Sequence, residues 1–199
     1  MGYGRTAEAC ARQCKEEGVE ITPQQAQLII DGIFTLYPGI PKLQERLRAR
    51  VQDPGWVRNC FGRYRRFIAT DDMVAMGELE RQALNFPFQS MVADAISTAL
   101  YYLHQHPRRA ELNYKIILQI HDAILLEVPV QHVDAVCDVL QECMVQRVSF
   151  KACDLNGVPY TDSPDYRFGI DVEVSARWGE KLSHEQCDLL GVDRKYGVA

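Results

Sequence analysis

The stretch from Lys115 to Val130, "KIILQIHDAILLEVPV", constrains the fold more than any other part of the chain. Two short apolar runs, rich in isoleucine and leucine, flank His121 and Asp122. Runs of this length indicate strands, and a polar dipeptide between them is typical of a hairpin turn. A buried carboxylate is costly unless it is paired or bound to a metal. The sequence therefore predicts a β-hairpin that carries His121 and Asp122 at its tip, outside the core.

The tip of this hairpin admits two interpretations. A carboxylate held between two buried strands can bind a divalent cation, provided that other carboxylates come from elsewhere. Alternatively, Asp122 serves the chemistry of the turn and His121 packs beside it. The dipeptide alone favours this second interpretation. A phosphohydrolase of the HD type is disfavoured, because it needs dispersed His and Asp ligands on helices, whereas the flanks of this His-Asp pair are strand-like.

Composition excludes several classes of protein. The 199 residues suffice for one domain or two small subdomains with a real core, and the net charge of -5 argues against simple coating of nucleic acid. Seven cysteines, an odd number with no CxxC pair, form no zinc or disulfide framework and favour a reducing cytoplasm. No signal peptide or run of membrane-spanning length is visible, so we expect no membrane partner.

Helical patterns come first along the chain, and strands mixed with helices follow. The expected fold is therefore α+β, with a helical part and a small, mainly antiparallel sheet packed on helices. Residues 55–70 look extended with a turn at Phe61-Gly62, and residues 154–166 look like a loop without a functional account. The predicted helices cover residues 5–17, 23–37, 41–52, 72–85, 89–104 and 131–148, and a late strand covers 168–178.

One predicted helix carries polar side chains suited to base edges. Arg81 and Asn85 are four residues apart and share a helical face, and Gln89 follows just past the interruption predicted at Pro87. Donors of this kind suit the minor groove, whose acceptors are nearly independent of sequence. Such a set could check duplex geometry without reading sequence. Taken alone, however, a solvated polar helix face explains these residues better.

A basic stretch lies between residues 42 and 66. It holds eight Lys or Arg side chains against Glu45 and Asp53, and Tyr64 interleaves its arginines. Local positive charge with interleaved aromatic rings suits contact with phosphates. A solvated surface explains the stretch equally well.

Together these segments resemble the family A DNA polymerases, the DNA polymerase I type. "LQIHDAILLEVP" is similar to the catalytic motif of that family that is often written VHDE, and "ERQALNFPFQSMVAD" is similar to the palm helix before it. "YG" at Tyr3-Gly4, "LYPGI" and "FGRYRR" resemble parts of the fingers, and "DVEVSARWGE" resembles the closing strand. The resemblance implies that residues 1–70 are the C-terminal part of the fingers and residues 71–199 the C-terminal part of the palm.

The same resemblance implies roles for individual residues. Asp122 is expected to be a catalytic carboxylate that binds Mg²⁺, in a site of two cations about 3.5–4 Å apart. His121 is expected against the primer terminus, and Tyr3 beside the nascent base pair and its nucleotide. Minor-groove contacts are implied for Arg81, Asn85 and Gln89, and contacts to the DNA backbone for Arg63, Arg65 and Arg66. The implied partners are primer-template DNA and a dNTP, in the cytoplasm of a bacterium or an infected host cell.

Two departures from the family pattern qualify these expectations. Ala123 stands where the motif usually has Glu, so we expect altered metal handling and not a dead site. The other catalytic Asp and the triphosphate-binding Lys and Arg belong upstream of the fingers, and none of that precedes Met1. We therefore expect a fragment, or one half of a split polymerase, that does not polymerise DNA alone and that needs the N-terminal polymerase portion as a partner. The alternative is a non-catalytic DNA-binding module that retains the polymerase fold.

Overall fold

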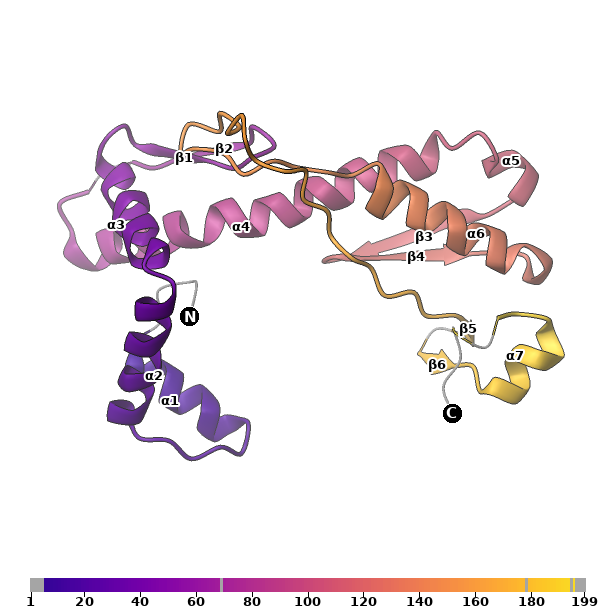
Figure 1. The fold of residues 1–199 in the computed structure, drawn as a ribbon, viewed down its shortest axis with the longest axis horizontal. Coiled ribbons are helices and arrows are strands. Elements are labelled where there is room, and N and C mark those ends of the chain that lie inside the picture. The colour runs from indigo at the N-terminus through magenta and orange to yellow at the C-terminus, as the bar shows by residue number, and fades with distance from the viewer. Residues whose placement is uncertain (1–5, 69, 178, 194, 196–199) are drawn as a thin grey trace. The chain divides into compact units, whose positions relative to one another are not determined.

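The computed structural model describes residues 6–68, 70–177, 179–193 and 195. Contacts divide the chain into two compact units, whose elements are labelled in Figure 1. Unit 1 comprises Met1–Met91 and Cys153–Tyr160, and unit 2 comprises Val92–Ala152 and Thr161–Ala199. Unit 1 therefore includes a short segment that is remote in sequence from the rest of it.

Two capped helices begin unit 1. Helix α1 (Ala7–Glu16) starts at Thr6, whose hydroxyl accepts a hydrogen bond from the amide of Ala9. Helix α2 (Pro23–Leu36) has Thr22 as N-cap in a capping box with Gln25, and its proline occupies a first-turn position that needs no amide hydrogen. Buried alanines and Ile30 join the two helices. Both predicted helices are thereby confirmed.

Helix α3 (Gly39–Gln52) leads into an antiparallel hairpin of β1 (Trp56–Arg58) and β2 (Tyr64–Arg66). Its buried face joins the hairpin and the start of helix α4 in one core. The members of this core include Leu47, Val51, Val57, Phe67, Ala83 and Leu84. The extended segment predicted around Phe61-Gly62 is confirmed as this hairpin.

Helix α4 (Met73–His104) corrects the sequence-based expectation of two helices. It runs unbroken through Pro87, where an interruption was predicted. A proline inside a helix removes one backbone hydrogen bond and costs about 3 kcal/mol. Here burial of both halves offsets that cost: Ala83 and Leu84 are buried on one side of the proline, and Ala99 and Leu103 on the other.

Unit 2 is built around the second hairpin, formed by β3 (Lys115–Ile120) and β4 (Ala123–Glu127). After the hairpin come η1 (Val130–His132), α6 (Val133–Leu140) and η2 (Gln141–Gln146), and α5 (Arg109–Leu112) precedes it. The predicted helix over 131–148 thus exists, but its last part has π geometry. Its buried face includes Val136 and Cys143, and these residues share a core with Leu103 and Tyr114.

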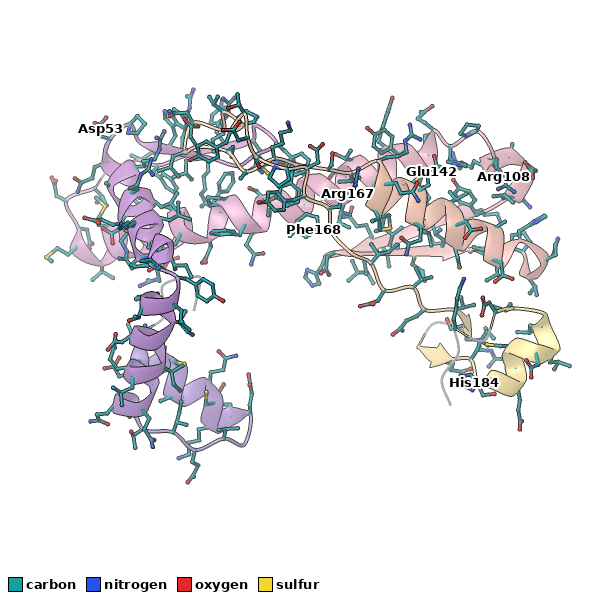
Figure 2. All side chains as sticks on the ribbon, viewed as in Figure 1. Asp53, Arg108, Glu142, Arg167, Phe168 and His184 are labelled. Atoms are coloured by element: carbon teal, nitrogen blue, oxygen red, sulfur yellow. The ribbon has the colours of Figure 1, made fainter. Side chains whose placement is uncertain are left out.

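The late strand predicted over 168–178 is wrong for most of its length. Only β5 (Ser175–Arg177) pairs, with β6 (Glu180–Lys181), before helix α7 (His184–Leu190). Exposure still alternates from Phe168 to Val174, as the sequence pattern predicts. The segment starts at an aromatic cluster, where the ring centroids of Phe150 and Phe168 lie 5.0 Å apart. Figure 2 labels Phe168. No strand of the described part of the chain pairs with residues 168–174, so the pattern produces an extended segment without a ladder.

The fold is α+β, with small antiparallel sheets and helices, as the sequence predicts. The boundary between fingers and palm at residue 70 stays a prediction. Among the described residues, no helix combines the length and apolar character that crossing a membrane requires.

Candidate functional site

The turn of the second hairpin consists of His121 and Asp122, because Ile120 pairs with Ala123 across it. His121 has φ 52°, the left-handed conformation that two-residue hairpin turns require. The side chain of Gln119 donates a hydrogen bond of 3.2 Å to the carbonyl oxygen of His121. Both turn residues are exposed. The sequence prediction of an exposed His-Asp pair at a hairpin tip is confirmed.

Asp122 is one of the residues that line a mainly apolar groove of about 800 Å³ within unit 2. Helices α4 and α6, strand β4 and the extended segment 168–174 provide most of its lining. Four carboxylates also line this groove, namely Asp122, Asp171, Glu173 and Glu180. The carboxylate of Asp122 at the turn therefore lies beside a mainly apolar groove.

These carboxylates do not form a metal site by themselves. Within the part of the chain that the structure describes, no three His, Cys, Asp or Glu side chains come together as metal ligands. The side chain of Ala123 beside the turn has no ligand atom. Asp122 can thus supply one carboxylate, and a two-cation site does not fit the described residues alone.

The polar set predicted on a helix is brought together by the continuity of α4. At 3.6 residues per turn, Arg81, Asn85 and Gln89 lie on one side of an unbroken helix within unit 1. The Oδ1 atom of Asn85 is buried and has no hydrogen-bond partner. Buried polar atoms nearly always have a partner, so this one points to a donor that the described residues do not supply.

Arg81, at the N-terminal end of this set, is held by Glu78. Its Nε donates a 3.0 Å hydrogen bond to Glu78, and this contact lowers the pKa of the Glu78 carboxyl. Gln89 is exposed. The side of α4 that carries Arg81, Asn85 and Gln89 therefore carries side chains with N–H donors.

The basic stretch separates into two groups in unit 1. Arg63, Arg65 and Arg66 are exposed at the turn and on β2, where the Arg66 guanidinium lies 5.5 Å from the centroid of the Tyr64 ring. Arg65 also donates a 2.6 Å hydrogen bond to Gln82 of α4. Arg50 and Arg58, by contrast, bind other parts of the protein. The exposed cations of this stretch, which also include Lys42, Arg46 and Arg48 of α3, are accessible to a phosphate backbone. Tyr3 lies outside the described residues.

Asn59 is a buried residue that supports the β1–β2 turn and that sequence reasoning missed. It is 1% exposed, and its Oδ1 accepts hydrogen bonds of 3.0 Å from the amides of Phe61 and Arg63. Its Nδ2 donates to Ser90 of α4 at 2.9 Å. The side chain thus shapes the turn that carries Arg63 and ties the turn to α4. An Asn just before a predicted turn was the available signal.

Known proteins resemble this chain over most of its length. The model of DNA polymerase family A matches residues 1–180. DNA polymerase I of Pseudomonas aeruginosa is 34% identical over 144 residues, which are 71% of this chain and 15% of that protein. DNA polymerase I A of Arabidopsis thaliana, chloroplastic/mitochondrial, is 28% identical over 72% of this chain and 13% of its own length.

A solved structure agrees with these relatives. The POL domain of Pol1 from M. smegmatis, in complex with DNA primer-template and dNTP, matches with a TM-score of 0.65 and 25% identity. The match covers 75% of this chain and 26% of that one. The chain thus spans well under a third of each of these proteins, and the family model covers nine tenths of it. The chain belongs to DNA polymerase family A.

Proposed function

We propose that this chain is the C-terminal portion of a DNA-directed DNA polymerase. In this proposal it holds primer-template DNA and contributes Asp122 to nucleotidyl transfer from a dNTP to the primer 3′-hydroxyl. The observation that carries the proposal is the exposed carboxylate of Asp122 at the tip of a hairpin that is anchored in the unit 2 core. That hairpin carries the segment similar to the second catalytic motif of the family.

The proposed roles follow the chemistry of each side chain. Asp122 would be one oxygen ligand of Mg²⁺, which when bound stabilises charge on the reacting phosphate. His121 would contact the primer terminus beside it. The minor groove would be contacted by Arg81, Asn85 and Gln89, whose side-chain N–H groups can donate to the acceptors of base edges. Arg63, Arg65 and Arg66 would contact the DNA backbone, and Tyr3 the incoming nucleotide.

We further propose that polymerisation needs polypeptide in addition to these residues. Two observations support this: the chain corresponds to 15% of the Pseudomonas aeruginosa relative, and no cluster of metal ligands exists among the described residues. The remaining carboxylate and the groups that hold the triphosphate would come from that additional part, on a longer chain or a separate subunit. The apolar groove beside Asp122 offers it a surface to pack against.

A second function is favoured by one specific observation. Ala123 stands in place of the usual Glu of the motif. A non-catalytic DNA-binding module would tolerate this replacement. Such a module needs the arginines and Asn85 but has no use for the Asp122 carboxylate. Asp122 therefore discriminates between the two functions.

Primer extension tests this directly. The purified chain should extend no primer with Mg²⁺, whereas addition of an upstream polymerase portion in trans should restore extension. Asp122→Asn should then lower the rate about a thousand-fold, because a metal contributes several kcal/mol to such a transition state. Asp138→Asn, at an exposed carboxylate of α6 outside the groove, is the matched control and should leave the rate unchanged.

Each outcome decides something. Extension by the chain alone would refute the need for additional polypeptide. A rate unchanged by Asp122→Asn would refute the proposed metal ligand. Salt-dependent DNA binding without any reconstituted extension would favour the binding module.

A further inference from the structure

Residues 153–160 form a short hairpin, here called the 153–160 hairpin, in the connection that was predicted to be a loop. Cys153 and Pro159 pair across it, and the amide of Asp154 donates a 2.9 Å hydrogen bond to the carbonyl oxygen of Val158. The Asp154 carboxylate accepts from the amides of Asn156 and Val158, at 2.8 and 2.9 Å. These bonds, led by that from Val158, lower the pKa of the Asp154 carboxyl. The hairpin therefore has a defined internal structure.

This hairpin belongs to unit 1, although the residues on both sides of it belong to unit 2. Figure 1 shows it, in orange, beside β1 and β2. Leu155 packs against the core that includes Val51 and Val57. The Asn156 side chain accepts a 3.1 Å hydrogen bond from Arg50, whose guanidinium also lies 4.4 Å from the centroid of the Trp56 ring. The apolar contact of Leu155 and the hydrogen bond from Arg50 thus hold the 153–160 hairpin against α3 and the β1–β2 hairpin.

Arg58 joins the 153–160 hairpin to the turn between β1 and β2. Its Nη1 donates to the carbonyl oxygen of Asn156 at 3.4 Å, and its Nε donates to that of Gly62 at 2.8 Å. The amide of Gly62 donates a 3.1 Å hydrogen bond to the carbonyl oxygen of Asn59, and the amide of Arg63 donates one of 3.0 Å to the side-chain Oδ1 of Asn59. The conformation of the turn that presents the exposed arginines is therefore coupled to a segment about a hundred residues away in sequence.

Gly157 makes this approach possible. Its φ is +77°, a conformation that side chains rarely adopt. A Cβ atom at this position would lie 2.7 Å from Cδ of Arg58 and 3.2 Å from the backbone oxygen of Asn59. Any larger residue would push Arg58 or the hairpin aside.

We propose that the 153–160 hairpin is a clasp that holds the β1–β2 turn in its DNA-binding conformation, with Asn156 and Gly157 as positioning residues. The inference rests on the proposed function, because it takes the exposed Arg63, Arg65 and Arg66 as contacts to the DNA backbone. A turn that is already ordered loses less conformational entropy on binding than a mobile one. The clasp thereby raises DNA affinity without touching DNA.

The test compares Gly157→Ala with Gly18→Ala in the full 199-residue chain. Gly18 has φ +84° and nothing within 4 Å of its Cβ position, so its substitution imposes similar backbone strain without a clash. Hydrogen exchange should speed up roughly tenfold at the amides of Phe61, Gly62 and Arg63 in Gly157→Ala, and remain unchanged there in Gly18→Ala. Asn156→Ala, which removes the acceptor for Arg50, should act in the same direction as Gly157→Ala but less.

DNA binding supplies the second readout, with a primer-template duplex as probe. Gly157→Ala should bind roughly three- to ten-fold more weakly than wild type, the range expected for ordering one or two side chains. Its slope of log K against log salt should be shallower by about 1, as for one lost phosphate contact. Gly18→Ala should match wild type in both.

The outcomes separate the two levels of the proposal. Unchanged exchange at the turn in Gly157→Ala, or an equal change in Gly18→Ala, overturns the clasp. If Gly157→Ala speeds hydrogen exchange at the turn but leaves DNA affinity and the salt slope unaltered, the clasp does not determine DNA binding and the proposal is overturned. If the wild-type chain binds the duplex without salt dependence, the proposed function fails, while hydrogen exchange still decides whether the clasp orders the turn.

Discussion

The two hairpins with proposed DNA-site residues are supported in opposite ways. The β1–β2 hairpin is held at its turn, where buried Asn59 accepts hydrogen bonds from two amides of the turn and donates one to α4. The β3–β4 hairpin is held at its base, where the hydroxyl of Tyr114, just before β3, donates a 2.6 Å hydrogen bond to the carbonyl oxygen of Leu103. Its turn is exposed and carries His121 in a left-handed conformation.

The difference teaches which part of the site this chain builds by itself. The arginine-bearing turn has its supports within unit 1. The His-Asp turn stands beside a groove, and Ile117, Leu118 and Ile120 of its own strand are at least 39% exposed. Exposed apolar strand residues together with an apolar groove are typical of an interaction surface. This contrast agrees with the proposal that the catalytic part needs material beyond the chain.

The largest effect on stability is expected at the support of the first hairpin. Asn59→Ala should lower the free energy of unfolding by about 2–4 kcal/mol, because it leaves two buried or partly buried amides without an acceptor and removes the donor to Ser90. Asn85→Ala is the matched control on α4: it removes an acceptor that has no partner and should leave stability unchanged or slightly higher. Denaturant unfolding of both variants measures this. An equal loss in both would remove the special role assigned to Asn59.

The base of the second hairpin should respond to alkaline pH. Burial raises the pKa of Tyr114 from 10.0 to about 12, so the folded state keeps a phenol proton that the unfolded chain releases. The stabilisation is therefore complete below pH 10 and is lost as pH rises from 10 to 12, by about 2–3 kcal/mol in total. Unfolding free energies of wild type and Tyr114→Phe, measured across this range, should converge as pH rises. A constant difference between them would show that the proton of Tyr114 does not anchor β3.

The smallest effect is expected at the tip of the second hairpin. His121→Gly should raise the free energy of unfolding by up to about 1 kcal/mol, because glycine adopts a positive φ without the strain that a side chain imposes. Asn113→Gly, at the other described non-glycine residue with positive φ, should gain less, since asparagine tolerates this conformation. Thermal or denaturant unfolding distinguishes the two. A destabilised His121→Gly would mean that the imidazole makes a stabilising contact and that the tip is not free of support.

Local patterns in the sequence predicted much of the site. The apolar runs around His121-Asp122 were sufficient to predict the β3–β4 hairpin, because the strands and the turn between them lie within sixteen residues. The spacing of Arg81 and Asn85 likewise predicted their shared helix face. The prediction of a late strand was wrong because a strand depends on a distant partner and not only on local pattern. Alternation at 168–174 indicates a half-buried segment, but a strand also needs a neighbour to pair with.

By itself, the sequence determined the α+β class, the position of Asp122 at a hairpin tip and the membership in a polymerase family. Tertiary structure decided what no local pattern contains. Packing on both sides of Pro87 keeps α4 whole and places Gln89 beside Asn85. The contact of Arg50 with Asn156 joins residues 106 positions apart and converts an apparent loop into a clasp. Periodicity reports only the environment of each residue, whereas these features depend on which distant segments share a core.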